Sequence, residues 1–183
     1  GQFGTRAGGS LLGRLKDAVL PESTDNANVN VMRAGEHFLA LTEVPTQVAF
    51  DPETLNTRGE WAFDDDVDAH VACAHPVVDP ESGATFTLSV RFGRTPSYVI
   101  TRLAAGETSR DVVATASLSD PVYVHSFALT PGHVVITSCP LVVDVWGLVR
   151  PGGHDTFLDA LDWRPGRPTT FVVVSRETGE VVA

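Results

Sequence analysis

Basic residues are scarce in this chain of 183 residues. Its 13 lysines and arginines stand against 23 aspartates and glutamates, which gives a formal net charge of −10, and Lys16 is the only lysine. Proteins that bind nucleic acid neutralise phosphates with cationic side chains, so we expect no nucleic-acid partner. An acidic, lysine-poor surface is typical of proteins from halophiles such as haloarchaea, and a GC-rich genome without halophily is the alternative.

The sequence also lacks long apolar runs and paired cysteines. No stretch approaches the roughly 18 apolar residues of a membrane-spanning helix. Residues 1–20 contain charged side chains where a signal peptide has its apolar core, so we expect a cytoplasmic protein. Cys73 and Cys139 have no partner at the spacing of a zinc site, and we expect both to be buried free thiols.

Several familiar catalytic motifs are absent. The chain has no Gly-x-Ser-x-Gly, Gly-x-Gly-x-x-Gly, P-loop or His-Glu-x-x-His pattern, which argues against the enzyme classes that depend on them. The acidic run over residues 64–68 could attract a hard cation, but it lacks the ligand spacing of an EF-hand loop. We therefore interpret this run as a solvated acidic loop.

Short runs rich in Val, Thr and Phe fill most of the chain, separated by Gly, Pro, Asp and Asn. This pattern predicts an all-β fold after one short amphipathic helix over residues 10–20. Three similar segments lie between apolar runs and should close hairpins, at residues 51–55, 79–83 and 175–179. The last two begin 96 residues apart, which is about twice the number of residues in one propeller blade. A β-propeller is therefore the leading architecture, and a sandwich is the alternative.

The end of the sequence suggests an unfinished hairpin. Residues 171–174 form an apolar run, a turn follows, and residues 180–183 begin a second apolar run. We therefore expect residues 1–183 to be one partial propeller domain of about four blades that stops at its C-terminus inside the fold.

Six histidines are the first candidates for metal ligands. His37, His133 and His154 follow glycine-containing turns and are set aside as solvated. His70 and His75 are separated by an odd number of residues, so on one continuous strand they would face opposite sides of the sheet. His75 is the better candidate of the two, although the residues alone favour a buried core histidine.

His125 and Glu43 occupy apolar surroundings that demand partners. Strand alternation places His125 on the same face as Tyr123, Phe127 and Leu129, where an unpaired imidazole costs on the order of a few kcal/mol. It therefore needs a hidden acceptor or a metal ion. On an extended strand Glu43 would face the same side as Leu39 and Leu41, which precede it. Its partner would be the ring N–H of a metal-bound histidine, and exposure to solvent at the strand end is the alternative.

Three segments in this order carry a family resemblance: residues 28–55, residues 74–83 with the sequence Ala-His-Pro-Val-Val-Asp-Pro-Glu-Ser-Gly, and residues 123–130 with Tyr-Val-His-Ser-Phe-Ala-Leu-Thr. Together they resemble the carotenoid cleavage oxygenases, a family that includes retinal-forming enzymes, apocarotenoid oxygenases and a retinoid isomerase. The likeness runs from about residue 26 to the end, so the chain resembles an N-terminal to central fragment of such an enzyme.

The resemblance implies part of a seven-bladed β-propeller with Fe(II) on its axis. In that family four histidines hold the iron directly, without carboxylate ligands. His75 and His125 match the first two, and Glu43 is similar to a glutamate that anchors a ligand histidine. The other two histidines would lie beyond Ala183. Phe127 is a candidate for the lining of the substrate tunnel.

The activity implied by the resemblance is cleavage of a carbon-carbon double bond in a carotenoid or apocarotenoid by dioxygen, which gives two carbonyl products. Three alternatives stay open. The first is a non-catalytic propeller that serves as a binding or scaffold protein and has lost part of the metal site. The others are retinoid isomerisation and the cleavage of stilbenes.

Enzymes of that family dock on membranes without spanning them. Residues 140–150 are apolar, with an interfacial tryptophan and a flanking arginine, and match the region near the tunnel mouth. The resemblance makes them a candidate for peripheral membrane contact, through Leu141, Val145, Trp146 and Leu148. An ordinary buried strand is the alternative.

Overall fold

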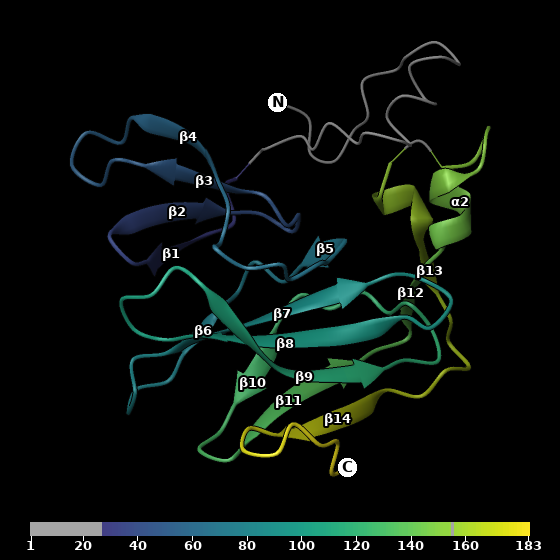
Figure 1. The fold of residues 1–183 in the computed structure, drawn as a ribbon. Helices are drawn as coiled ribbons and strands as arrows, with labels where there is room; N and C mark the ends of the chain where they lie inside the picture. The colour runs from purple at the N-terminus through teal and green to yellow at the C-terminus, as the bar shows by residue number, and fades with distance from the viewer. Residues whose placement is uncertain (1–26, 155) are drawn as a thin grey trace.

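The structure, a computed structural model, describes residues 27–154 and 156–183, and its regular structure is almost entirely strand (Figure 1). Within these ranges helix is limited to α2 (Val145–Val149) and one 3-10 turn, η1 (Leu158–Ala160). The prediction of an all-β chain is confirmed. The amphipathic helix expected over residues 10–20 lies outside the described residues.

The first sheet is a four-stranded antiparallel meander. Its strands are β1 (Asn30–Ala34), β2 (His37–Leu41), β3 (Gln47–Phe50) and β4 (Thr57–Trp61), paired in sequence order. Buried residues alternate with more exposed ones along β1, β2 and β3, as expected for a sheet with one buried face. That face includes Met32, Leu39 and Leu41, which cluster with Leu103 of the second sheet.

The second sheet lies at the centre of the described chain. Its strands are β5 (Val71–Ala72), β6 (Val77–Val78), β7 (Thr85–Arg91), β8 (Ser97–Leu103) and β9 (Arg110–Ser117). β5 and β6 both pair with β7, so two short pieces together form one row of the sheet. Every residue of β8 except Arg102 is buried, because this strand contributes to the clusters shared with both neighbouring sheets.

The third and fourth sheets are smaller. The third contains β10 (Phe127–Leu129), β11 (His133–Ser138) and β14 (Thr170–Ser175), and a bridge between Val174 and Val181 begins a further row. The fourth is a ribbon of β12 (Leu141–Val143) and β13 (Leu161–Trp163), which follows β11 and precedes β14 in the sequence. The chain between its two strands forms α2 and η1 (Figure 1). The described residues thus form four sheets of unequal size.

Three turns share one hydrogen-bond pattern. In each turn the N–H of the first residue donates to the carbonyl five residues later, and the N–H of the fifth residue donates back to the carbonyl of the first. The turns begin at Asp51, Asp79 and Ser175, and their fifth residues are Leu55, Gly83 and Gly179, all with positive φ. Each turn closes a hairpin, as the sequence predicted.

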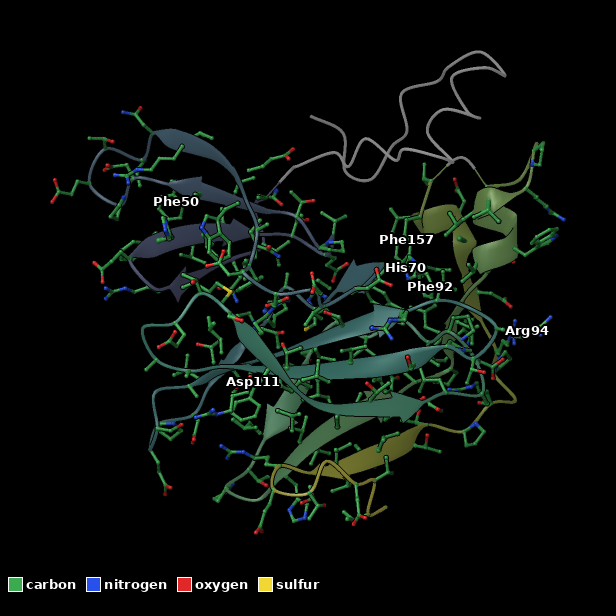
Figure 2. The ribbon with its side chains drawn as sticks, in the orientation of Figure 1. Phe50, His70, Phe92, Arg94, Asp111 and Phe157 are labelled. Carbon is green, nitrogen blue, oxygen red and sulfur yellow. The ribbon has the colours of Figure 1, made fainter. Side chains whose placement is uncertain are left out.

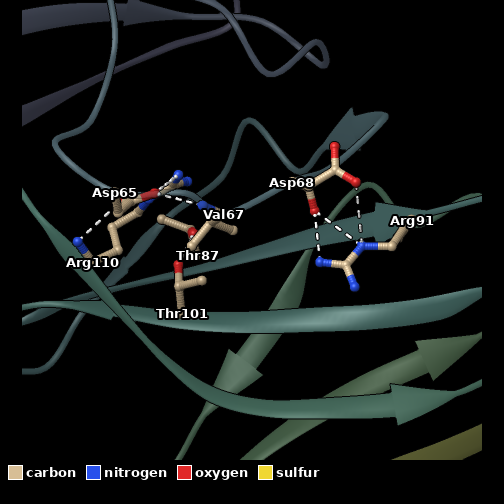
Figure 3. A network of polar contacts seen from close by, with 7 residues as sticks. All are labelled: Asp65, Val67, Asp68, Thr87, Arg91, Thr101 and Arg110. Atoms are coloured by element: carbon tan, nitrogen blue, oxygen red, sulfur yellow. Dashed lines mark hydrogen bonds and ion pairs between the residues drawn. The ribbon is translucent and has the colours of Figure 1, made fainter.

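The acidic run over residues 64–68 is only partly the solvated loop that the sequence predicted, because Asp64, Asp66 and Asp68 are exposed but Asp65 is not. Asp65 is nearly buried and accepts from Arg110 of β9 at 2.7 and 2.8 Å, and Asp68 pairs with Arg91 of β7 (Figure 3). Burial by itself raises the pKa of the Asp65 carboxyl, but the hydrogen bonds from Arg110 and Val67, together with the charge of Arg110, outweigh burial, so this pKa lies below its usual value. The two ion pairs hold the segment that connects the first two sheets against β7 and β9.

Candidate metal centre

His75 lies where the first row of the second sheet is interrupted. Ala72 pairs with Ser89 and Val77 pairs with Phe86, so residues 73–76 stand opposite only two residues of β7. The two surplus residues move this segment out of the strand ladder, as in a β-bulge. His75 therefore sits in a short loop between β5 and β6, and a continuous strand over this region, on which the parity argument relied, is not present.

His70 has a structural role. Its Nδ1 accepts a hydrogen bond of 3.0 Å from the backbone N–H of Phe92, and the two rings stack with centroids 5.7 Å apart (Figure 2). The structure therefore separates His70 from His75, although the physical reason is the interrupted strand and not the alternation of one strand.

His125 lies at a bend immediately before β10. The strand expected over residues 123–129 is shortened to β10, and the segment before it is held by the bridge between Val122 and Val142. The side chains of Tyr123 and His125 still meet, with the Tyr123 hydroxyl 3.1 Å from His125 Nδ1. Phe127 instead packs against the core shared by the second and third sheets.

The two histidines meet from different sheets. Their Nε2 atoms are 3.1 Å apart, and their ring centroids are 4.5 Å apart with the planes at 62°. Two nitrogen ligands that each lie about 2.1 Å from an ion, in adjacent coordination positions, are about 3.0 Å apart. The pair therefore fits two neighbouring ligands of one metal ion, and neutral imidazoles suit Fe(II).

Glu43 fixes the tautomer of His125. One oxygen, Oε1, lies 2.7 Å from His125 Nδ1, and because an ionised carboxylate can only accept, His125 Nδ1 carries the proton. The lone pair of His125 is then on Nε2, which faces His75. The backbone carbonyl of Glu43 accepts from the N–H of Ala72 at 3.1 Å, so the glutamate is anchored to the second sheet. Its position does not fit the alternative of a glutamate that reaches into solvent.

Tyr123 is a member of the site that the sequence did not identify. Its hydroxyl donates to the same Oε1 of Glu43 at 2.7 Å. Burial, followed by the hydrogen bond and the charge of Glu43, raises the pKa of the Tyr123 hydroxyl, so it stays a donor. The signal in the sequence was its position two residues before His125, on the same strand face.

Two free thiols contact the backbone of residues in the site. Cys73 is buried, and its Sγ lies 2.9 Å from the backbone oxygen of His125 and 3.8 Å from that of His75. Burial, with a smaller effect from the charge of Glu43, raises the pKa of the Cys73 thiol to about 11. Cys139 is half-buried, with its Sγ 3.6 Å from the backbone oxygen of Tyr123. Both are free, as expected, but only Cys73 is fully buried.

No third ligand joins the pair within residues 27–154 and 156–183, where no group of three or more histidine, cysteine or acidic side chains could hold an ion. His154, expected to be solvated, is half-buried, and its Nε2 lies 2.9 Å from Asp144 Oδ2. That aspartate caps α2 by accepting from the N–H of Gly147. His154 therefore fastens the loop after α2.

The expected membrane segment is divided between a buried strand and an exposed helix. Val142 and Val143 of β12 are buried, whereas Trp146 of α2 is 70% exposed. Leu141, Val145 and Leu148 are only partly exposed. Three further exposed apolar side chains that the sequence did not single out lie on α2, η1 and β13. With Trp146 they are what we call the tryptophan patch: Trp146, Val149, Leu158 and Trp163. None of the helices in the described part of the chain is long and apolar enough to cross a membrane.

Solved structures share this architecture. A variant of the Synechocystis apocarotenoid oxygenase superposes with a TM-score of 0.75 over 98% of the chain, at 20% sequence identity, and the chain covers 38% of that protein. The lignostilbene dioxygenase of Pseudomonas brassicacearum superposes with a TM-score of 0.72 over 86% of the chain, at 31% identity, and 32% of it is covered. The four sheets are therefore part of a seven-bladed β-propeller.

Sequence comparison agrees with the fold. The chain matches the retinal pigment epithelial membrane protein family over residues 2–183. It is 36% identical to the chloroplastic carotenoid cleavage dioxygenase 8 of Arabidopsis thaliana over 87% of its length, and 31% identical to the resveratrol cleavage oxygenase 1 of Aspergillus fumigatus over 91%. It spans only 28% and 33% of these two relatives. The chain thus belongs to the retinal pigment epithelial membrane protein family, which comprises the carotenoid cleavage oxygenases.

Proposed function

We propose that His75 and His125 bind Fe(II) in a dioxygenase that cleaves a carbon-carbon double bond of a carotenoid or apocarotenoid. The observation that carries this proposal is the 3.1 Å separation of the two Nε2 atoms, with His125 held by Glu43 in the tautomer that a metal requires. The names of several relatives support the reaction type, since they are carotenoid cleavage dioxygenases.

The residues of this chain prepare the site. His75 and His125 supply neutral nitrogen ligands, and Glu43 keeps the proton of His125 on Nδ1 so that Nε2 is free to bind. Tyr123 neutralises part of the carboxylate charge with a hydrogen bond and holds Glu43 in place. Fe(II) would supply the activation of dioxygen next to the double bond. Four histidines complete the site in the family pattern, so two more ligands are needed beyond the two that the described residues supply.

The substrate class is proposed from the relatives. A carotenoid cleavage dioxygenase at 36% identity favours a carotenoid or apocarotenoid. Cleavage of a stilbene is the second candidate, because two relatives at 31% identity are named as a resveratrol cleavage oxygenase and a lignostilbene dioxygenase. Both reactions give two carbonyl products from one double bond, so product analysis with both substrates separates them.

The test uses the full-length gene product, reconstituted anaerobically with Fe(II). We expect about one bound iron per chain and aldehyde products from a carotenoid. His75→Ala and His125→Ala should each remove both, whereas His133→Ala, which changes an exposed histidine at the start of β11, should leave both unchanged. A folded full-length protein that binds no iron would overturn the proposal in favour of a non-catalytic propeller.

A peripheral contact with a membrane is the second part of the proposal. The tryptophan patch is apolar, exposed and carried on a projecting ribbon (Figure 1). Tryptophan side chains prefer the interface between lipid and water, and an apolar substrate is dissolved in the bilayer. We place the protein in the cytoplasm, on the surface of a membrane.

A further inference from the structure

The backbone carbonyls of His75 and His125 both lie outside the strand ladders. His75 is in the loop between β5 and β6, and His125 is at the bend before β10. Neither carbonyl receives a hydrogen bond from a backbone N–H of the described residues. A carbonyl outside the strand ladders is satisfied either by a side-chain donor or by water.

One side chain reaches both carbonyls. Cys73 Sγ lies 2.9 Å from the oxygen of His125, which is 52 residues away in sequence, and 3.8 Å from the oxygen of His75. A thiol has a single proton to donate. The short contact to His125 is therefore the principal hydrogen bond, and the longer contact to His75 is secondary. No other donor reaches the carbonyl of His125 from the part of the chain that the structure describes.

We propose that Cys73 is a positioning residue whose S–H group sets the distance between the imidazole nitrogens of His75 and His125. The thiol belongs to the same segment as His75, and it binds the backbone of His125, so it joins the two segments that carry the rings. The proposal rests on the proposed function only for the identity of the ion, since the contact between the rings exists without metal.

Glu43 and Cys73 constrain different parts of His125. Glu43 binds Nδ1 of the His125 ring and so fixes the rotation of the ring. Cys73 binds the main chain of His125 and so fixes the position of the backbone from which the side chain extends. The backbone N–H of Cys73 donates to Leu88 at 2.8 Å, which anchors the thiol to β7. Cys73 is also only 7% exposed and belongs to the core cluster of the second and third sheets, which holds its thiol in place.

The test compares three substitutions at Cys73 in the metal-free 183-residue chain. Cys73→Ala removes the donor, Cys73→Val removes it while filling the space, and Cys73→Ser keeps a donor in the form of a hydroxyl. Cys139→Ala is the matched control, because it removes the other free thiol, which contacts Tyr123 at a longer 3.6 Å. Circular dichroism verifies that each variant is folded.

The first measurement is the nuclear Overhauser effect between ring protons of His75 and His125. We expect this effect in the parent chain, in Cys73→Ser and in Cys139→Ala, and we expect its loss in Cys73→Ala and Cys73→Val. The second measurement is the affinity for Zn²⁺ by titration calorimetry. We expect the alanine and valine variants to bind Zn²⁺ about threefold to tenfold more weakly and the serine variant to bind within about twofold of the parent.

Two results would overturn the proposal. One is that the alanine and valine variants keep the ring contact and the Zn²⁺ affinity of the parent. The other is that the serine variant is as impaired as the alanine variant, which would assign the effect to the volume of sulfur and not to its proton. If the ring contact depends on Cys73 as expected while the full-length protein binds no iron, the positioning role is supported and only the proposed function fails.

Discussion

Leu55 adopts the same left-handed backbone conformation in its turn that Gly83 adopts in the next turn, with φ values of 59° and 68°. Both are the fifth residue of a turn with the same hydrogen-bond pattern, so both must have a positive φ. Leu55 is 74% exposed and gains little from packing. The side chain of a leucine clashes with its own backbone in this conformation, whereas glycine has no Cβ.

We therefore expect Leu55→Gly to stabilise the protein. The relief of the left-handed conformation, about 1–2 kcal/mol, exceeds the greater entropy of glycine in the unfolded chain, about 0.5–1 kcal/mol. The free energy of unfolding in urea should rise by about 0.5–1 kcal/mol. Gly83→Leu is the reverse control and should lower it. An unchanged or lower stability of Leu55→Gly would contradict the argument.

Loss of the ion pair between Asp65 and Arg110 should destabilise the protein at low pH. Burial raises the pKa of Asp65, but the hydrogen bonds from Arg110 and Val67 and the charge of Arg110 together lower it below its ordinary value of 3.8. A carboxyl whose pKa is lower in the folded state stabilises the fold above its unfolded pKa, and this contribution disappears as the pH falls through the lower folded value. The urea midpoint should therefore decrease below about pH 4.

Asp65→Asn tests the assignment of this effect. It leaves the nearly buried guanidinium of Arg110 without its anion, so the free energy of unfolding at neutral pH should decrease by about 3 kcal/mol. The acid-dependent loss should also become shallower. Asp66→Asn is the matched control, because the neighbouring Asp66 is exposed, and it should leave both the stability and its pH profile nearly unchanged.

Local features of the fold were predictable because they depend on neighbours in sequence. The turns at Asp51, Asp79 and Ser175 carry residues that form turns by their own chemistry, and all three close hairpins. The burial and ion pairing of Asp65 within the acidic run were not predictable, because its partner Arg110 lies 45 residues away in the sequence. Composition identified the charges but could not identify their partners.

The structure brings together the side chains of His75, His125 and Glu43, which the sequence singled out, but by a construction that the sequence did not predict. The argument from side-chain alternation assumed one continuous strand through His75. That strand is interrupted, because two more residues lie between β5 and β6 than between their partners on β7. Glu43 was singled out because a carboxylate in an apolar run needs a partner, and it meets His125. The contributions of Tyr123 and Cys73 arise from contacts across 80 and 52 residues, which periodicity does not reveal.

The tryptophan patch should govern binding to neutral lipid vesicles. Because the chain has a net charge of −10, attraction must come from apolar contact and not from anionic lipid. We expect the double variant Trp146→Ala with Trp163→Ala to reduce the vesicle-bound fraction about tenfold in sedimentation with phosphatidylcholine. Phe171→Ala removes a comparably exposed aromatic side chain from β14 and should have no effect. Equal loss in both would argue against a specific membrane face.

Glu43→Gln should weaken metal binding while leaving the fold intact. The amide is close to the size of the carboxylate and its oxygen still accepts from His125 Nδ1, so His125 keeps its tautomer in part. The negative charge that makes the imidazole more basic is lost, and affinity for Fe(II) in the full-length gene product should fall about tenfold. Tyr123→Phe, which removes only the donor to Glu43, should cause a smaller loss.

Glu60→Gln on β4 is the control for the change of charge, because Glu60 is exposed and lies on the sheet whose connection between β2 and β3 carries Glu43. The affinity is measured by anaerobic titration, and the ring nitrogen shifts of His125 report its tautomer in the metal-free protein. Glu43→Gln should increase the fraction of His125 that carries its proton on Nε2, since a neutral acceptor holds the Nδ1 proton less strongly. If the affinity falls equally in Glu60→Gln, net charge is responsible, and the hydrogen bond from His125 to Glu43 has no special part in preparing the ligand.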